Sequence, residues 1–301
     1  MRKIILILLS LSALSAHGAT TPGLCHEDTP GKLLRDVAPL IDLSVEKLPG
    51  QAPQPTQVAG IYGEEDTRLL VPKHAPYPFT ALGKISWGNA QCTAVMVGRC
   101  HILTARHCLD RAKQKTGSAE ISFVSADEKS RSTINVSQSG QDAKTLSEGD
   151  WAVARLDSSL GDRTGWMGLS AFSGKNLSKW ITGSCNKDGK LILAGYSIDI
   201  DQGKSLSIDD QVEMIRHEKT NLLRFRGQSF QGSSGSPIWR YDCQGNPEIV
   251  ALNTTAAYNP VKGGQAFLPA NETKNLAAGI ATDEFFGKMK AFVKKYPCAA
   301  E

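Results

Sequence analysis

The sequence predicts an all-β fold that ends in one helix, and two observations carry this prediction. Short apolar runs of four to six residues recur between residues 82 and 252, and turn residues such as Gly88-Asn89 and Asp188-Gly189 separate them. Many short strands with turn signals between them are typical of a β-sandwich or a β-barrel. Near the C-terminus the apolar residues change to a helical spacing, at Phe285, Met289, Phe292 and Val293.

The apolar runs predict strands at residues 82–87, 92–97, 101–105, 121–124, 151–156, 191–196, 222–225, 238–241 and 249–252. The C-terminal helix carries polar residues that suit its ends. Thr282 is placed to cap it, and Asp283 and Glu284 fall in its first turn. Lys294-Lys295 fall in the last turn, where positive charge favours the helix dipole.

The first 19 residues have the pattern of a secretion signal. Arg2-Lys3 precede an apolar run at residues 4–14, and the small residues Ala16 and Gly18 favour a cut after Gly18, with Ala19 as the alternative. The run is too short to span a bilayer. We therefore expect a signal at 1–19, a propeptide or N-terminal extension with a Pro-rich linker at 20–57, and one globular domain at 58–301. The mature protein is expected to be secreted or periplasmic.

Composition and charge exclude some partners. The chain has a hydrophobic content of 41%, 21% charged residues and a formal net charge of +4. Two of the positive charges, those of Arg2 and Lys3, are expected to be removed with the signal. The remaining excess is too small to indicate a nucleic acid or a membrane as partner. The sequence does not predict an oligomeric state.

Seven cysteines, at positions 25, 92, 100, 108, 185, 243 and 298, suit an oxidising compartment. Their spacing lacks the paired CxxC pattern of a zinc site, so we expect disulfides and no metal. Because seven is odd, at least one thiol is free or pairs with another molecule.

The segment 232–237, with the sequence GSSGSP, has the composition of a nucleophile loop. Glycines let backbone N–H groups approach a reacting atom, and acyl transfer needs a hydroxyl nucleophile with such donors beside it. A plain Gly/Ser turn before Ile238-Trp239 is the alternative for this segment alone.

Two upstream segments accompany it: 104–108 reads TARHC and 149–156 reads GDWAVARL. In this order the three resemble the TAxHC, DxAxxxL and GxSGxP motifs of trypsin/chymotrypsin-like serine peptidases. The opening of the domain, at 61–68 and 77–85, resembles the bacterial glutamyl endopeptidase-like group. The resemblance covers residue 58 to the C-terminus and implies two six-stranded antiparallel β-barrels with the active site between them. The C-terminal helix is then expected to pack on the second barrel.

The resemblance also implies roles for individual residues. Ser234 is the expected nucleophile, His107 the base that takes its proton, and Asp150 the carboxylate that orients and stabilises the imidazole. Gly232 and Ser234 are expected to supply the N–H groups of the oxyanion hole. The implied activity is hydrolysis of peptide bonds in protein or peptide substrates, through an acyl-enzyme and without a cofactor.

One departure from the family pattern is at Ser233, where trypsin-like enzymes carry an aspartate that pairs with a newly cut N-terminal amine. Activation by that ion pair is therefore not expected, and glutamyl endopeptidase-like members also lack the carboxylate. The resemblance implies a Cys92–Cys108 disulfide, and a second between Cys185 and Cys243 is compatible with their positions. Cys25, Cys100 and Cys298 stay unassigned.

The specificity pocket of this family is lined by residues shortly before the serine and by the strand after it. Here these are Gln228, Ser229, Asn253 and Thr254, which are all neutral. These residues provide no charged group that would give the enzyme a strict preference for basic or for acidic substrate side chains. Two other readings remain open at this point: a non-catalytic binding protein on the same fold, and a disulfide-rich adhesion protein.

Overall fold

The computed structural model describes residues 61–62, 66–87, 90–116, 121–140, 149–172, 191–217, 222–255, 267–268 and 276–299. The expected signal and extension at 1–57 lie outside these residues. None of the helices in the described ranges is long and apolar enough to cross a membrane.

The first barrel closes from six antiparallel strands in the order β3-β4-β5-β8-β7-β6. Its strands are β3 (Leu82–Trp87), β4 (Ala90–Gly98), β5 (His101–Thr104), β6 (Ser122–Ser125), β7 (Arg131–Ser139) and β8 (Ala152–Leu156). Alternating apolar side chains such as Ile85, Leu103 and Phe123 point inward and are fully buried. The pairing of β3 with both β4 and β6 closes the ring.

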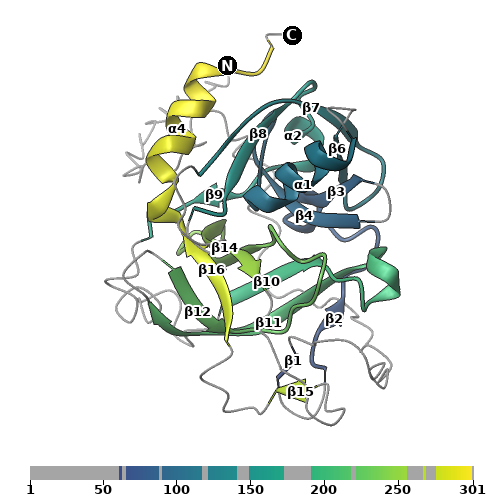
Figure 1. Ribbon diagram of the computed structural model, residues 1–301, viewed down its shortest axis with the longest axis vertical. Coiled ribbons are helices and arrows are strands. Elements are labelled where there is room, and N and C mark those ends of the chain that lie inside the picture. The colour runs from purple at the N-terminus through teal and green to yellow at the C-terminus, as the bar shows by residue number, and fades with distance from the viewer. Residues whose placement is uncertain are drawn as a thin grey trace, which may run out of the picture.

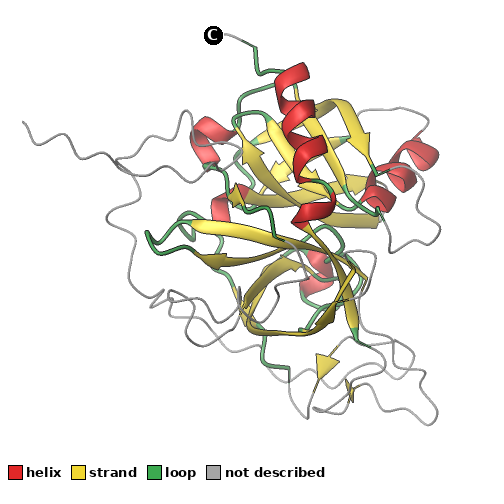
Figure 2. Ribbon diagram, turned by 90° about the vertical axis from the view of Figure 1, so that its left-hand side faces the viewer, coloured by secondary structure: helices red, strands yellow, loops and turns green. Residues whose placement is uncertain are grey.

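The second barrel is built from six antiparallel strands in the order β10-β13-β14-β16-β12-β11, and pairing of β11 with β10 closes it. These strands are β10 (Leu191–Tyr196), β11 (Leu206–His217), β12 (Leu222–Arg226), β13 (Pro237–Tyr241), β14 (Pro247–Thr255) and β16 (Ala277–Ala281). The two barrels lie one above the other in Figure 1, and the turned view of Figure 2 shows the same arrangement. The predicted fold, two six-stranded antiparallel barrels with a C-terminal helix, is confirmed.

Shorter elements complete the fold. Two-residue strands add β2 (Leu69–Leu70) to β11 and β9 (Gly168–Leu169) to β14, and join β1 (Ile61–Tyr62) to β15 (Phe267–Leu268). The helices are α1 (Arg106–Thr116), α2 (Gly161–Thr164) and α4 (Phe286–Lys295), and short 3-10 turns occur at η2 (Phe79–Ala81), η4 (Asp201–Gly203) and η5 (Thr282–Glu284).

The C-terminal helix forms as predicted, but its packing partner differs from the expectation. Although α4 follows the last strand of the second barrel, it runs alongside the first barrel (Figure 1). Phe285, just before the helix, stacks on Trp151 with ring centroids 5.5 Å apart. A Cys100–Cys298 disulfide then joins the end of the chain to the first barrel. The helix therefore ties the two barrels together.

The expected cap of this helix is wrong. Thr282 lies inside the turn η5, where its hydroxyl donates to the Ser170 carbonyl and accepts from the Phe172 N–H. These contacts fasten the end of β16 to the segment that follows β9. The Thr282 hydroxyl is therefore used in tertiary contacts and not, as local sequence predicted, at the end of the helix.

Candidate active site

Ser234 lies in the connection between β12 and β13, residues 227–236, which we call the serine loop. Two internal hydrogen bonds shape the loop: Ser233 N–H donates to Phe230 O at 3.1 Å, and Ser236 N–H to Ser233 O at 3.0 Å. Gly232 and Gly235 have φ values of +97° and +86°, a region that glycine adopts without the steric cost of a Cβ. The turn therefore requires the two glycines of the sequence GSSGSP.

Strand β14 holds the serine loop from the second barrel. Asn253 receives the Gly235 N–H at its carbonyl (2.8 Å) and donates its own N–H to Ser236 O (2.9 Å). Its side-chain amide donates to the Ser233 carbonyl at 3.0 Å. Asn253 is fully buried, so these bonds are shielded from water.

Strand β4 holds the same loop from the first barrel through Thr93. The Thr93 N–H donates to Ser234 O at 2.9 Å, and its hydroxyl donates to Gly232 O at 3.1 Å. Contact between the barrels is close here, since a Cβ on Gly235 would lie 2.2 Å from Thr93 O and 2.9 Å from Ala105 N. Only glycine fits at this point, and the serine loop meets the first barrel two residues before His107.

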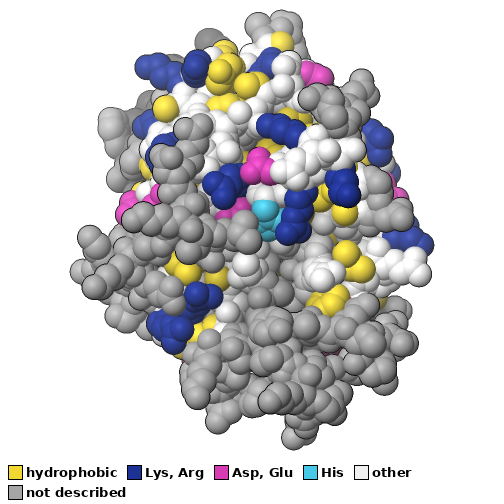
Figure 3. Space-filling view, in the orientation of Figure 1, with side chains coloured by type: hydrophobic (Ala, Val, Ile, Leu, Met, Phe, Trp, Pro, Cys, Tyr) yellow, Lys and Arg dark blue, Asp and Glu magenta, His cyan; other side chains and the backbone are white. Residues whose placement is uncertain are grey.

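His107 and Asp150 are in direct contact across the first barrel. His107 is the second residue of α1, and its Nδ1 lies 2.7 Å from Asp150 Oδ2, while its backbone N–H donates to Asp150 Oδ1 at 2.8 Å. The carboxylate side chain is 1% exposed and the imidazole 15%. A carboxylate can only accept, so Nδ1 carries the proton in this bond, and in the neutral imidazole the lone pair is then on Nε2. Figure 3 shows a histidine at the surface in the middle of this face, with acidic and basic side chains beside it.

Ser234 lies close to this pair through its backbone. Its carbonyl oxygen is 3.8 Å from the sulfur of Cys108, the neighbour of His107. Among the described residues, no hydrogen bond joins Ser234 Oγ to the imidazole. In the same set, the N–H groups of Gly232 and Ser234 donate to no acceptor, whereas those of Ser233, Gly235 and Ser236 all do. Two unused donors therefore flank the serine, which is what binding of a developing oxyanion requires.

Comparison with known proteins assigns the family. The family model described as Trypsin matches residues 71–265. The chain belongs to the trypsin family. It is thus a serine endopeptidase of the hydrolase class. A glutamyl endopeptidase of Bacillus licheniformis is 24% identical over 238 residues, which cover 74% of this chain and 67% of that protein.

Two solved structures share the fold. A Glu endopeptidase in complex with MPD has a TM-score of 0.57 and 18% identity, covering 77% of this chain and 98% of its own. A scabies mite inactivated protease paralogue has a TM-score of 0.51 and 13% identity, covering 72% and 96%. Both support the trypsin-family architecture and, at these identities, nothing finer.

The four residues expected to line the specificity pocket are all buried in this trypsin-family chain. Gln228 is 8% exposed, and its amide is occupied: Oε1 accepts from Thr67 N–H at 2.9 Å and Nε2 donates to Thr67 Oγ1 at 2.5 Å. Thr254 donates to Ala278 O at 3.1 Å. Ser229 Oγ and Asn253 Oδ1 are buried and have no hydrogen-bond partner among the described residues.

The structure has the Cys92–Cys108 disulfide that the resemblance implied, and it brackets His107. Cys243 is also disulfide-bonded, and Cys185, its suggested partner, lies outside the described residues. Two groups bring a histidine near cysteines, Cys92-His107-Cys108 and Cys100-His101-Cys298. Their cysteines are joined in disulfides, and a disulfide sulfur is not the thiolate ligand that a metal needs.

Sequence reasoning missed Thr93, which contacts three segments of the site. Besides binding Ser234 and Gly232, its hydroxyl accepts the Tyr196 N–H at 2.9 Å, and its carbonyl accepts the Thr104 hydroxyl at 2.8 Å. It follows a cysteine in an ordinary apolar strand. No local pattern distinguishes it, because its partners lie far away along the chain.

Proposed function

We propose that this serine endopeptidase is exported and cleaves proteins or peptides through Ser234, His107 and Asp150. One observation carries the assignment: His107 Nδ1 lies 2.7 Å from the buried Asp150, next to a loop in which the N–H groups of Gly232 and Ser234 bind no acceptor among the described residues. A buried carboxylate bonded to Nδ1 leaves Nε2 as a base on the other side of the ring.

In the acylation step, His107 Nε2 takes the Ser234 hydroxyl proton while Oγ attacks the carbonyl carbon of the scissile peptide bond. The negative charge that develops on the carbonyl oxygen is bound by the N–H groups of Gly232 and Ser234. The imidazolium formed is stabilised by Asp150 and then gives its proton to the leaving amine, so the C–N bond breaks and an ester forms.

In the second step a water molecule replaces the amine. His107 takes a proton from the water, the hydroxide attacks the ester carbon, and the same two N–H groups bind the oxyanion again. Return of the proton to Ser234 Oγ releases the carboxylic acid. The overall reaction adds one water molecule across the peptide bond, with H going to the amine and OH to the acyl group. The cycle therefore needs no cofactor or metal.

We further propose that the chain outside the described residues has the organisation read from the sequence. Residues 1–19 direct export to a secreted or periplasmic location, and 20–57 form a propeptide or extension before the peptidase domain at 58–301. A zymogen is one consequence of a propeptide. N-terminal sequencing of the exported protein tests both boundaries.

Labelling with an active-serine phosphonate tests the catalytic assignment. Ser234→Ala is expected to abolish labelling and peptidase activity, while circular dichroism stays native. Ser236→Ala is the matched control: this buried hydroxyl, two residues away, has no hydrogen-bond partner in the part of the chain that the structure describes, so its removal is expected to be nearly neutral. Wild-type labelling also excludes a non-catalytic binding protein. Undiminished hydrolysis by Ser234→Ala would overturn the proposal.

A further inference from the structure

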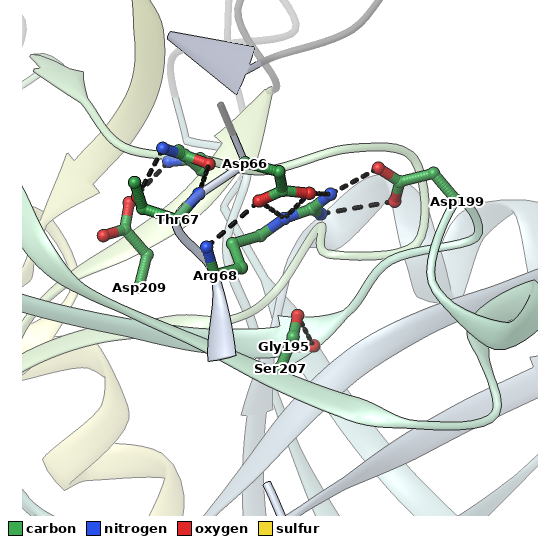
Figure 4. Close-up of polar contacts among 8 residues, drawn as sticks. Asp66, Thr67, Arg68, Gly195, Asp199, Ser207 and Asp209 are labelled. Carbon is green, nitrogen blue, oxygen red and sulfur yellow. Dashed lines mark hydrogen bonds and ion pairs between the residues drawn. The ribbon is translucent and has the colours of Figure 1, made fainter. Parts of the chain in front are cut away.

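The segment Asp66-Thr67-Arg68, which we call the strap, lies directly before β2 on the second barrel. Strand β2 pairs with β11 through Leu69↔Ile208 and Leu70↔Ser207, and so fixes where the strap crosses the barrel. Figure 4 shows the strap side chains reaching in two directions, toward Asp199 on one side and toward Asp209 on the other.

The first arm of the strap is an ion cluster around Arg68. Its guanidinium is 3% exposed and binds two carboxylates: Nε and Nη2 donate to Asp66 (2.9 and 2.6 Å to the nearer oxygens), and Nη2 donates to Asp199 Oδ2 at 2.5 Å. Burial alone lowers the pKa of Arg68, but the two hydrogen-bonded carboxylates more than offset this and raise it. Arg68 is therefore always charged, and its planar fork fixes Asp199 in place.

Asp199 belongs to a segment that contacts the serine loop. Its neighbour Ile198 donates its N–H to Gln231 O at 2.7 Å. That oxygen belongs to the same peptide unit as the Gly232 N–H, and in a trans peptide the C=O and N–H point in opposite directions. Holding Gln231 O therefore sets the direction in which the Gly232 N–H points.

The same peptide is also packed closely against this segment. A Cβ on Gly232 would lie 2.6 Å from Tyr196 O and 3.3 Å from Ile198 Cγ1. The Gln231–Gly232 peptide thus depends on the position of residues 196–198, and the adjacent Asp199 is held in turn by Arg68.

The second arm of the strap holds the start of the serine loop. Thr67 occupies both polar atoms of the Gln228 amide, and the Gln228 N–H donates to Asp209 Oδ2 at 2.6 Å. The strap therefore contacts the serine loop directly at Gln228 and, through Asp199, next to Gly232. These two anchor points lie on either side of Phe230, whose carbonyl closes the turn at Ser233.

We propose that Arg68 is a positioning residue for the oxyanion hole: through Asp199 it holds the Gln231–Gly232 peptide so that the Gly232 N–H faces the reacting carbonyl oxygen. The inference rests on the proposed function, which gives the Gly232 N–H its role. It assigns to the strap a chemical consequence that packing alone does not have. Losing Arg68 lets this peptide rotate, and the transition state then loses a donor while substrate binding keeps its contacts.

The test compares Arg68→Met, Arg68→Lys and Asp199→Asn with the wild-type protein. Steady-state kinetics give kcat and KM on a peptide substrate, normalised to the active sites that a phosphonate titrates. Losing one oxyanion donor costs about 10²–10³-fold in kcat. We expect a fall of about that size for Arg68→Met with KM within about threefold, and an intermediate fall for Arg68→Lys, which keeps the charge without the fork.

Arg99→Met is the matched control. Arg99 forms a forked pair with Asp162 on the first barrel, away from the serine loop, so its loss removes an arginine–aspartate pair without touching the Gly232 peptide. Its kcat is expected to equal that of the wild type. Thermal unfolding of every variant separates lost stability from lost turnover.

An unchanged kcat per active site in Arg68→Met, together with a lowered Tm, would show that the strap is only structural and overturn the inference. Where Arg68→Met does not fold, Asp199→Asn provides the same test. This substitution removes the charge of a partly exposed carboxylate and leaves a side chain of the same size in place. A wild-type protein that neither hydrolyses peptides nor reacts with the phosphonate overturns the proposed function and the inference with it. Wild-type activity with unchanged strap variants overturns the inference alone.

Discussion

Substituting Gly235 by alanine is predicted to destabilise the protein and disable the serine loop together. The Cβ added at this position would lie 2.2 Å from Thr93 O and 2.3 Å from Thr104 Oγ1, and neither is the free end of a flexible side chain. The backbone of Gly235 also has φ +86°, a conformation that an L-residue adopts only at a cost. The clash and the strain act together at a point where the serine loop packs directly against the first barrel.

The magnitude follows from these two contributions. A left-handed conformation costs an alanine about 1–2 kcal/mol, and overpacking a close contact costs about 1–3 kcal/mol. One kcal/mol shifts the Tm of a domain of this size by about 2–4 °C. We therefore expect Gly235→Ala to lower the Tm by about 4–20 °C, measured by circular dichroism, and to lower kcat because Ser234 is the adjacent residue.

Gly287→Ala provides a matched control with the opposite sign. Gly287 lies in α4, and no described residue comes within 4 Å of the position that its Cβ would take. Alanine in a helix is favoured over glycine by about 0.5–1 kcal/mol, so this variant should unfold at the same or a higher temperature. A Gly235→Ala protein that unfolds like Gly287→Ala would refute the assignment of a close inter-barrel contact at residue 235.

Three more predictions address stability and specificity. Replacing Cys100 and Cys298 together by alanine opens a link between residues 198 apart in the sequence, for which the chain-entropy relation gives about 5 kcal/mol; denaturant unfolding that shows no loss would contradict a role in tying the barrels. Burial lowers the pKa of His101 in the folded protein, although the bond to the Tyr296 carbonyl acts in the opposite direction. As the pH falls, the unfolded chain therefore binds a proton at this histidine before the folded protein does. The contribution of His101 to stability is complete above about pH 6.5 and decreases as the pH drops toward the folded pKa. Guanidinium titrations at pH 7.5 and 5 should show this fall, and a His101→Gln variant should show less of it. Because the neutral Gln228 amide is already bound, cleavage of a peptide library should show less than about hundredfold preference, about 2.7 kcal/mol, for Arg/Lys or for Glu; a larger preference would refute this reading of the pocket.

The sequence predicted best the strands that carry continuous apolar runs. The run at 191–196 corresponds to β10 residue for residue, and nine predicted runs all fall on barrel strands. Three barrel strands were missed, and each has a physical reason. Strands β7 and β11 contain many polar residues because one face meets water. Strand β16, which pairs between β12 and β14, has four small residues out of five and so lacks a strong apolar signal. Such segments depend on their neighbours for their β structure.

The candidate site likewise contains residues that local sequence predicts and residues that it does not. His107, Asp150 and Ser234 stand in short motifs whose composition local chemistry dictates, so the sequence alone was enough to single them out. The partner of Gln228 lies 161 residues away at Thr67, and Arg68 reaches Asp199 across 131 residues. Nothing in a local pattern reports such pairs. The expectation that Gln228 offers its amide to a substrate is therefore one that sequence reasoning had no means to check.

The serine loop is held from several independent directions, and this matters for catalysis. Thr93 binds it from the first barrel, Asn253 from β14, Ile198 from the segment after β10, and Thr67 from the strap. Fixing a backbone residue costs about 1–2 kcal/mol of conformational entropy, and the three glycines in the loop make that cost larger. Folding orders the loop before substrate binds. The two proposed donors, the N–H groups of Gly232 and Ser234, then need no reorganisation when negative charge develops on the substrate carbonyl oxygen. On the proposed roles of Ser234 and Arg68, the strap contributes to this order from a distant part of the sequence that the motif around Ser234 does not include.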